Sequence, residues 1–97
     1  MQAMKILLTV DWVERTIAPA TDCSVRNIGG RSGEMEWKHS EKQAIAYIED
    51  GLFDYFVKDH SRNLKVHVSS TAEGKKYLEV ENGHQTPLSQ TILPSHI

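Results

Sequence analysis

The composition is that of one small folded domain. The chain has 97 residues and a net charge of -2, with 39% hydrophobic and 25% charged residues. It is therefore neither disordered nor collagen-like, and one domain with a modest core is expected over residues 1–97. The nearly balanced charge excludes a strong field that would attract nucleic acid or an anionic membrane.

The chain opens with a predicted strand. Over residues 4–12 apolar side chains recur with a period of two, which indicates a strand with one buried face. Leu7 is the exception to this alternation. Pro19 ends the pattern, because proline cannot donate a ladder hydrogen bond. A second strand is predicted over residues 23–28.

A glycine-rich stretch follows the second predicted strand. Gly29, Gly30 and Gly33 surround a basic residue, Arg31, so their backbone N–H groups could hold a phosphate. The stretch lacks the Gly-Lys-Ser/Thr ending of a P-loop and does not open a helix. We therefore predict that the second strand ends at Gly29 and that a flexible connector follows.

One short helix is predicted next. Ser40 and Gln43 have the spacing of a capping box, in which each side chain satisfies a free backbone N–H of the other. An apolar stripe then recurs at helical spacing, formed by Ala44, Ile45 and Ile48. Gly51 is the expected end of the helix. Trp37 precedes the helix and is expected to pack over its first turn.

Three strands are predicted after the helix, because the apolar period changes from 3.6 to two. The strands begin near Phe53, Leu64 and Tyr77 and are separated by polar turns. Residues 82–97 open with a turn and contain apolar residues broken by prolines. We expect this segment to be an irregular tail packed on the sheet.

These elements predict an α+β fold. The order is β-β-α-β-β-β, and the expected architecture is a small two-layer domain with one helix packed on a mainly antiparallel sheet.

Short motifs from about Val25 onward extend over most of the chain, namely Ile28-Gly29-Gly30, Trp37, Ile45, Ile48, Gly51, Tyr55, Val57, Val66, Val68, Gly74, Tyr77-Leu78, Gly83 and Leu93-Pro94. This pattern resembles a family of short, mostly bacterial proteins known as domain of unknown function three-eight-nine-two. The sequence departs from the family pattern at Glu79 and Val80, where the family usually has a basic residue and threonine. The resemblance implies a small compact domain and no particular activity.

Catalytic and metal chemistry have little support in the sequence. The five histidines are His39, His60, His67, His84 and His96. No pair has the close spacing of metal ligands on one element, although His60, His67 and Asp59 could meet across a hairpin. Cys23 at the start of a strand is typical of a small buried hydrophobe rather than a nucleophile. We expect no catalytic residue, no metal and no cofactor.

Nucleic-acid binding is the alternative function. Basic residues lie on the three-strand meander and its turns, namely Lys58, Arg62, Lys65, Lys75 and Lys76, with His67 between them. Against this function, Phe53 and Tyr55 are assigned to the core. Glu73, Glu79 and Glu81 would also weaken the positive field.

Protein binding is the leading hypothesis. Trp37, Tyr47 and Tyr77 are large aromatic residues of the kind enriched at contact hot spots, and a sheet of this size exposes an edge. We therefore predict a non-catalytic module that binds another protein or itself, with Lys65 and His67 as further contact residues. An enzyme acting on a small molecule comes third and would require a cleft containing His67 and a perturbed carboxylate.

The expected compartment is the cytoplasm. Cys23 is the only cysteine, so no disulfide can form within the chain. The apolar run at residues 6–8 is too short for a signal peptide or a membrane span. We read no targeting segment.

Overall fold

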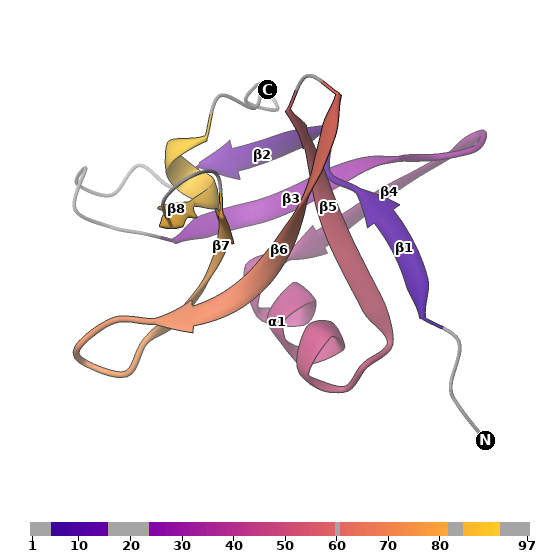
Figure 1. Ribbon diagram of the computed structural model, residues 1–97. Helices are drawn as coiled ribbons and strands as arrows, with labels where there is room; N and C mark the ends of the chain where they lie inside the picture. Colours follow the sequence, from indigo (N-terminus) through magenta and orange to yellow (C-terminus); the bar gives the residue numbers. More distant parts are fainter. Residues whose placement is uncertain (1–4, 16–23, 60, 82–84, 92–97) are drawn as a thin grey trace.

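The described part of the chain forms two β-sheets with one α-helix at one end of them (Figure 1). The computed structural model describes residues 5–15, 24–59, 61–81 and 85–91. In chain order the elements are β1 (Ile6–Thr9), β2 (Trp12–Arg15), β3 (Val25–Ser32), β4 (Met35–Ser40), α1 (Glu41–Glu49), β5 (Phe53–Asp59), β6 (Arg62–Ser70), β7 (Lys76–Glu81), β8 (Gln85–Pro87) and the 3-10 turn η1 (Leu88–Gln90). Strands therefore dominate the described part of the chain.

The larger sheet has five strands in the order β1-β5-β6-β7-β8. β1 lies parallel to β5, with Ile6 opposite Phe53, and the other neighbours are antiparallel. β6 pairs with β5 through its first residues, up to Lys65, and with β7 from Val66 onward. The long strand β6 thus joins the β1–β5 side of the sheet to the β7–β8 side.

The smaller sheet has three antiparallel strands in the order β2-β3-β4. The core consists of buried side chains from both sheets, α1 and η1, namely Leu8, Val10, Val13, Val25, Ile28, Ala44, Tyr55, Val57, Val66, Leu78, Val80 and Leu88. Because α1 contacts strands of both sheets, it closes one end of this core.

The predicted helix is confirmed. Ser40 Oγ accepts a hydrogen bond from the Gln43 N–H at 3.1 Å, and Gln43 Oε1 accepts one from the Ser40 N–H at 3.0 Å. Gly51 follows with φ of 73°, a conformation that glycine adopts without a Cβ clash. The helix has nine residues, and no helix in the described ranges is long and apolar enough to cross a membrane.

Glu41 links the start of α1 to both sheets. Its carboxylate accepts a hydrogen bond from the Val25 N–H of β3 at 3.1 Å and another from the backbone of Leu78 in β7. Burial raises the pKa of this carboxyl, and the hydrogen bonds to Val25 and Leu78 oppose that rise. The first residue of the helix is therefore hydrogen-bonded to one strand of each sheet.

The predicted first strand is divided in two. Residues 4–12 were expected to form one strand, but β1 ends at Thr9 and β2 begins at Trp12 in the other sheet. The Val10 N–H bonds to the Phe56 carbonyl at 2.7 Å, whereas the next N–H, of Asp11, bonds to the Gly29 carbonyl at 2.8 Å. The apolar alternation changes face at this corner: Val10 and Val13 are buried in the core, whereas Trp12 is half-buried and packs against Gly29.

Gly29 and Gly30 do not end the second strand, as the sequence predicted, but lie inside β3. A Cβ on Gly29 would overlap the Trp12 ring, and one on Gly30 would overlap the Thr9 carbonyl oxygen. The two glycines are therefore needed for close packing of β1 and β2 on β3. Gly33 does lie in the following turn, with φ of 63°.

The strand β4 was not predicted. Trp37 was expected to precede the helix and pack over its first turn, yet it lies within β4, opposite Gly30 of β3. Its neighbours Glu36 and Lys38 are exposed, so the segment lacks the apolar alternation of a typical strand. The three strands predicted after the helix are confirmed as β5, β6 and β7.

The structure confirms one helix among predominantly strands and places the strands in two sheets rather than one. Part of the segment expected to be irregular forms β8 and η1, in which Leu88 is fully buried. Residues 82–84 and 92–97 of that segment lie outside the described ranges.

Gly30→Ala should lower the free energy of unfolding by about 1–3 kcal/mol, because the added methyl group meets a backbone oxygen that cannot rotate away. Ser32→Ala, at an exposed position of the same strand, is the control and should change stability by less than about 0.5 kcal/mol. Urea denaturation of the three proteins measures the difference. Equal midpoints for Gly30→Ala and the parent would contradict the tight approach of β1 to β3.

Candidate functional site

Two of the predicted contact residues, Trp37 and Tyr47, belong to an aromatic cluster around His39. Trp37 and His39 come from β4, and Tyr47 comes from α1. The His39 ring centroid lies 5.1 Å from the rings of both Trp37 and Tyr47, and Phe53 and Tyr55 of β5 complete the cluster. Trp37 and Tyr47 are half-buried, so much of their surface packs inward.

A partly buried hydrogen bond lies within this cluster. The Tyr55 side chain is fully buried, and its hydroxyl lies 2.8 Å from His39 Nδ1. Burial raises the pKa of the Tyr55 phenol and lowers the pKa of the His39 imidazole. Both shifts favour the neutral forms, and the tautomer of the His39 ring decides which of the two groups donates this hydrogen bond.

The other three predicted contact residues lie on the outer face of the larger sheet. Tyr77 and His67 both contact the Glu79 carboxylate. His67 Nε2 lies 2.9 Å from one carboxylate oxygen, and the Tyr77 hydroxyl donates to the other at 3.3 Å. Glu79 is only 2% exposed, and the pairing of β6 with β7 places it directly opposite His67. Both of its oxygens are thus already engaged within the sheet.

Lys65 extends this outer face. Its ammonium lies 3.9 Å from the Asp54 carboxylate, which also contacts Lys5 at 3.6 Å. A shallow hollow of about 480 Å³ lies beside it, lined by Asn63, Leu64, Lys65, His67 and Glu81. The hollow contains His67, as an enzyme would require, but Glu81 is the carboxylate among these lining residues. Glu79 does not line the hollow and is held by His67 and Tyr77.

A second hollow, of about 460 Å³, lies over the smaller sheet and is lined by Trp12, Glu36, Trp37 and Lys38. No group of three or more histidine, cysteine or acidic side chains in the described ranges could hold a metal ion. Of the residues considered for metal or thiol chemistry, His60, His84, His96 and Cys23 lie outside those ranges.

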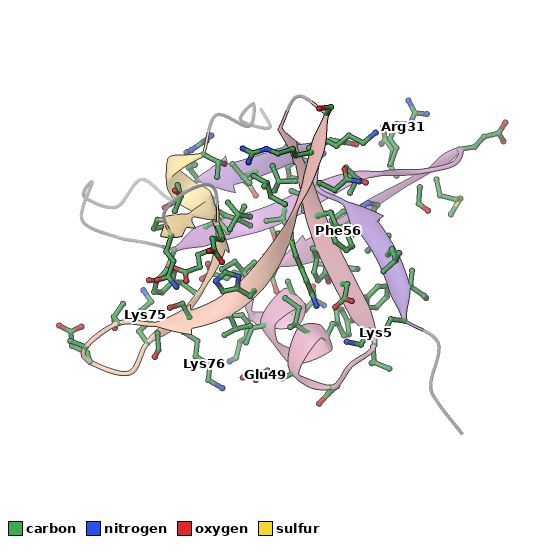
Figure 2. The ribbon with its side chains drawn as sticks, viewed as in Figure 1. Lys5, Arg31, Glu49, Phe56, Lys75 and Lys76 are labelled. Carbon is green, nitrogen blue, oxygen red and sulfur yellow. The ribbon has the colours of Figure 1, made fainter. Side chains whose placement is uncertain are left out.

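The basic residues of the meander do not gather in one place. Figure 2 shows Lys75 and Lys76 at the far end of the β6–β7 hairpin from Phe56, where Lys76 Nζ contacts Glu49 at 2.6 Å. Lys65 lies opposite Phe56 in the pairing of β5 with β6. Phe53 and Tyr55 pack in or against the core, as the sequence predicted.

Three exposed apolar side chains lie at or beside the edge of the larger sheet, where β1 is the outermost strand (Figure 1). Ile6 is 54% exposed, Leu7 is 63% exposed, and Leu52, whose carbonyl accepts the Ile6 N–H, is 49% exposed. We define these three residues as the β1 edge patch. Sequence reasoning missed this patch, although Leu7 gave a signal by interrupting the apolar alternation.

Comparisons with family models, with curated proteins and with solved structures find no match. The resemblance to the family of unknown function therefore stays a prediction, and the argument about function depends on the geometry of this chain.

Acidification should weaken the fold through His39. Because burial disfavours the imidazolium, the folded protein binds this proton less tightly than the unfolded chain. The stability that neutral His39 contributes is present above pH 6.5, its ordinary pKa, and is lost as the pH falls through the lowered folded pKa. Denaturation curves at about pH 7.5 and 5.5 should therefore show a larger loss for the parent than for His39→Gln. Equal losses would contradict this role for His39.

Proposed function

We propose that this protein is a small non-catalytic module that binds another protein chain by strand addition at the β1 edge patch. The observation that supports this proposal is the exposure of Ile6 and Leu7 on an edge strand, with Leu52 beside them. Edge strands that expose apolar side chains favour pairing with another strand, and native proteins usually protect them. The patch is small, which fits a weak or regulated contact.

The backbone of β1 also favours strand addition. The Ile6 and Val10 N–H groups bond toward β5, to the carbonyls of Leu52 and Phe56. Since backbone groups alternate in direction along a strand, the N–H and C=O of Leu7 point away from β5. An extended segment can therefore add to the sheet through backbone hydrogen bonds while its side chains contact the patch.

The charges beside the patch are not fully balanced. Lys5 is the nearest cation, and its ammonium lies 3.6 Å from Asp54 of the neighbouring strand. Asp54 also contacts Lys65 at 3.9 Å, so two cations share one carboxylate beside the patch. We place the module in the cytoplasm, because the chain has a single cysteine.

Leu7→Lys should abolish capture of a protein partner, because it replaces the most exposed apolar side chain of the patch with a charged one. Met35→Lys is the matched control: Met35 is 73% exposed, but it lies on the β3–β4 hairpin. Nuclease-treated native extract is passed over immobilised parent and variants, and bound proteins are identified by mass spectrometry. A partner retained by Leu7→Lys and lost by Met35→Lys would overturn the proposed surface.

Single-stranded nucleic acid is the second candidate partner. Phe56 and Lys65 lie on the same outer face of the sheet and are paired across β5 and β6, and an aromatic residue beside a cation can stack and neutralise a nucleotide. Against it, Glu79 lies opposite His67, and Glu81 lines the hollow beside Lys65. This arrangement explains why we rank it second.

If nucleic acid binds there, Phe56→Ala should weaken binding by roughly ten-fold or more, in line with about 1–3 kcal/mol per stacked base. Lys42→Ala, at an exposed site on α1, should have little effect. A gel-shift titration with a fluorescent oligonucleotide, repeated at raised salt, measures both variants. No shift with the parent at low salt would eliminate this candidate.

A further inference from the structure

We infer that the β1 edge patch binds an extended acidic and apolar segment of a partner chain, in which a carboxylate side chain lies opposite Lys5 and an apolar side chain lies opposite Leu7. The inference rests on the proposed function and names the chemistry of its partner. It follows from which part of β1 is open to pairing, from the side chains that this part carries and from the contacts of Lys5.

The open part of β1 is short. In the described ranges β1 has β5 on one side and no strand on the other. Beyond Leu7 the strand approaches the smaller sheet, because the Thr9 carbonyl oxygen lies against Gly30 of β3. A partner segment can therefore pair with residues 5–7 and must turn away from the sheet before it reaches Thr9.

Three backbone groups in this part of β1 point away from β5. The Ile6 N–H bonds to the Leu52 carbonyl, so the Lys5 carbonyl, on the other side of the same trans peptide, points outward. The N–H and C=O of Leu7 point the same way, because backbone groups alternate in direction along a strand. A segment that pairs antiparallel, the more stable direction, can bond to all three groups with two of its residues. Those two residues lie directly opposite Lys5 and Leu7.

The side chains of β1 decide which residues fit these two positions. Leu8 is buried in the core, so Leu7 and Lys5 project from the outer face of the sheet. Side chains directly opposite each other on neighbouring strands share a face, and opposite charges there are stabilising whereas like charges are destabilising. The position opposite Lys5 therefore favours aspartate or glutamate. The position opposite Leu7, which is 63% exposed, favours an apolar residue.

Lys5 can bind such a carboxylate without leaving Asp54 unpaired. Its ammonium lies 3.6 Å from the Asp54 carboxylate, and Lys65 contacts the same carboxylate at 3.9 Å. When Lys5 turns to a carboxylate of the added segment, Lys65 still neutralises Asp54. A basic residue opposite Lys5 would instead add a third cation around one carboxylate, so the same geometry disfavours a basic segment.

A matched pair of peptides tests this chemistry. The probes are the blocked pentapeptides Gly-Leu-Val-Glu-Gly and Gly-Leu-Val-Lys-Gly, whose glycines let both ends leave the sheet. The dissociation constant of each peptide with the full chain is measured from the NMR shift of the Leu7 N–H. The glutamate peptide should bind at least about three times more tightly than the lysine peptide, because opposite charges attract across a strand pair. Equal affinities, or tighter binding of the lysine peptide, would overturn the inference.

Charge reversal at Lys5 tests whether this residue sets the preference. Lys5→Glu should bind the lysine peptide more tightly than the glutamate peptide, and Lys5→Ala should bind the two equally. Lys42→Glu, at an exposed site on α1, is the matched control and should keep the preference of the parent. A Lys5→Glu protein that still prefers the glutamate peptide would overturn the role of Lys5.

Peptide binding and partner capture separate this inference from the proposed function. If neither peptide shifts the Leu7 N–H at concentrations up to about 5 mM, the inference is overturned. The proposed function then stands if a protein partner is still captured through Leu7. Loss of both peptide binding and capture overturns both.

Discussion

The fold depends on the corner at Val10 and Asp11, where the chain passes from one sheet to the other. Successive backbone N–H groups bond to different sheets, Val10 to Phe56 and Asp11 to Gly29. This direct link is possible because Gly29 and Gly30 present no side chain to the Trp12 ring and the Thr9 carbonyl. The two sheets can then share one core, which α1 closes at its end through Glu41.

The same corner accounts for the proposed binding surface. It holds the Thr9 end of β1 against β3 and leaves the Ile6 end at the margin of the larger sheet, so one short strand is anchored at one end and open at the other. A longer open edge would invite unregulated association, and a fully covered one could pair with nothing. The structure thus combines a closed core with a limited region available for pairing.

The candidate site was only partly predictable. Trp37, Tyr47, Tyr77, Lys65 and His67 were singled out by residue type, and the structure divides them between an inward aromatic cluster and the polar outer face of the larger sheet. Residue type cannot reveal this division, because it depends on which strands become neighbours. Leu7 was visible as a break in the apolar alternation, but its exposure follows from the position of β1 at the sheet edge.

By itself the sequence determined the local elements. The capping box at Ser40, the glycine at position 51 and the alternation in β5, β6 and β7 are short-range signals, so they specify α1 and the meander without knowledge of the rest of the chain. Only the tertiary structure decided the division into two sheets, the parallel pairing of β1 with β5 and the recruitment of Glu36–Lys38 into β4. Strand pairing joins residues far apart in sequence, and its hydrogen bonds come from the backbone, which leaves little trace in side-chain pattern.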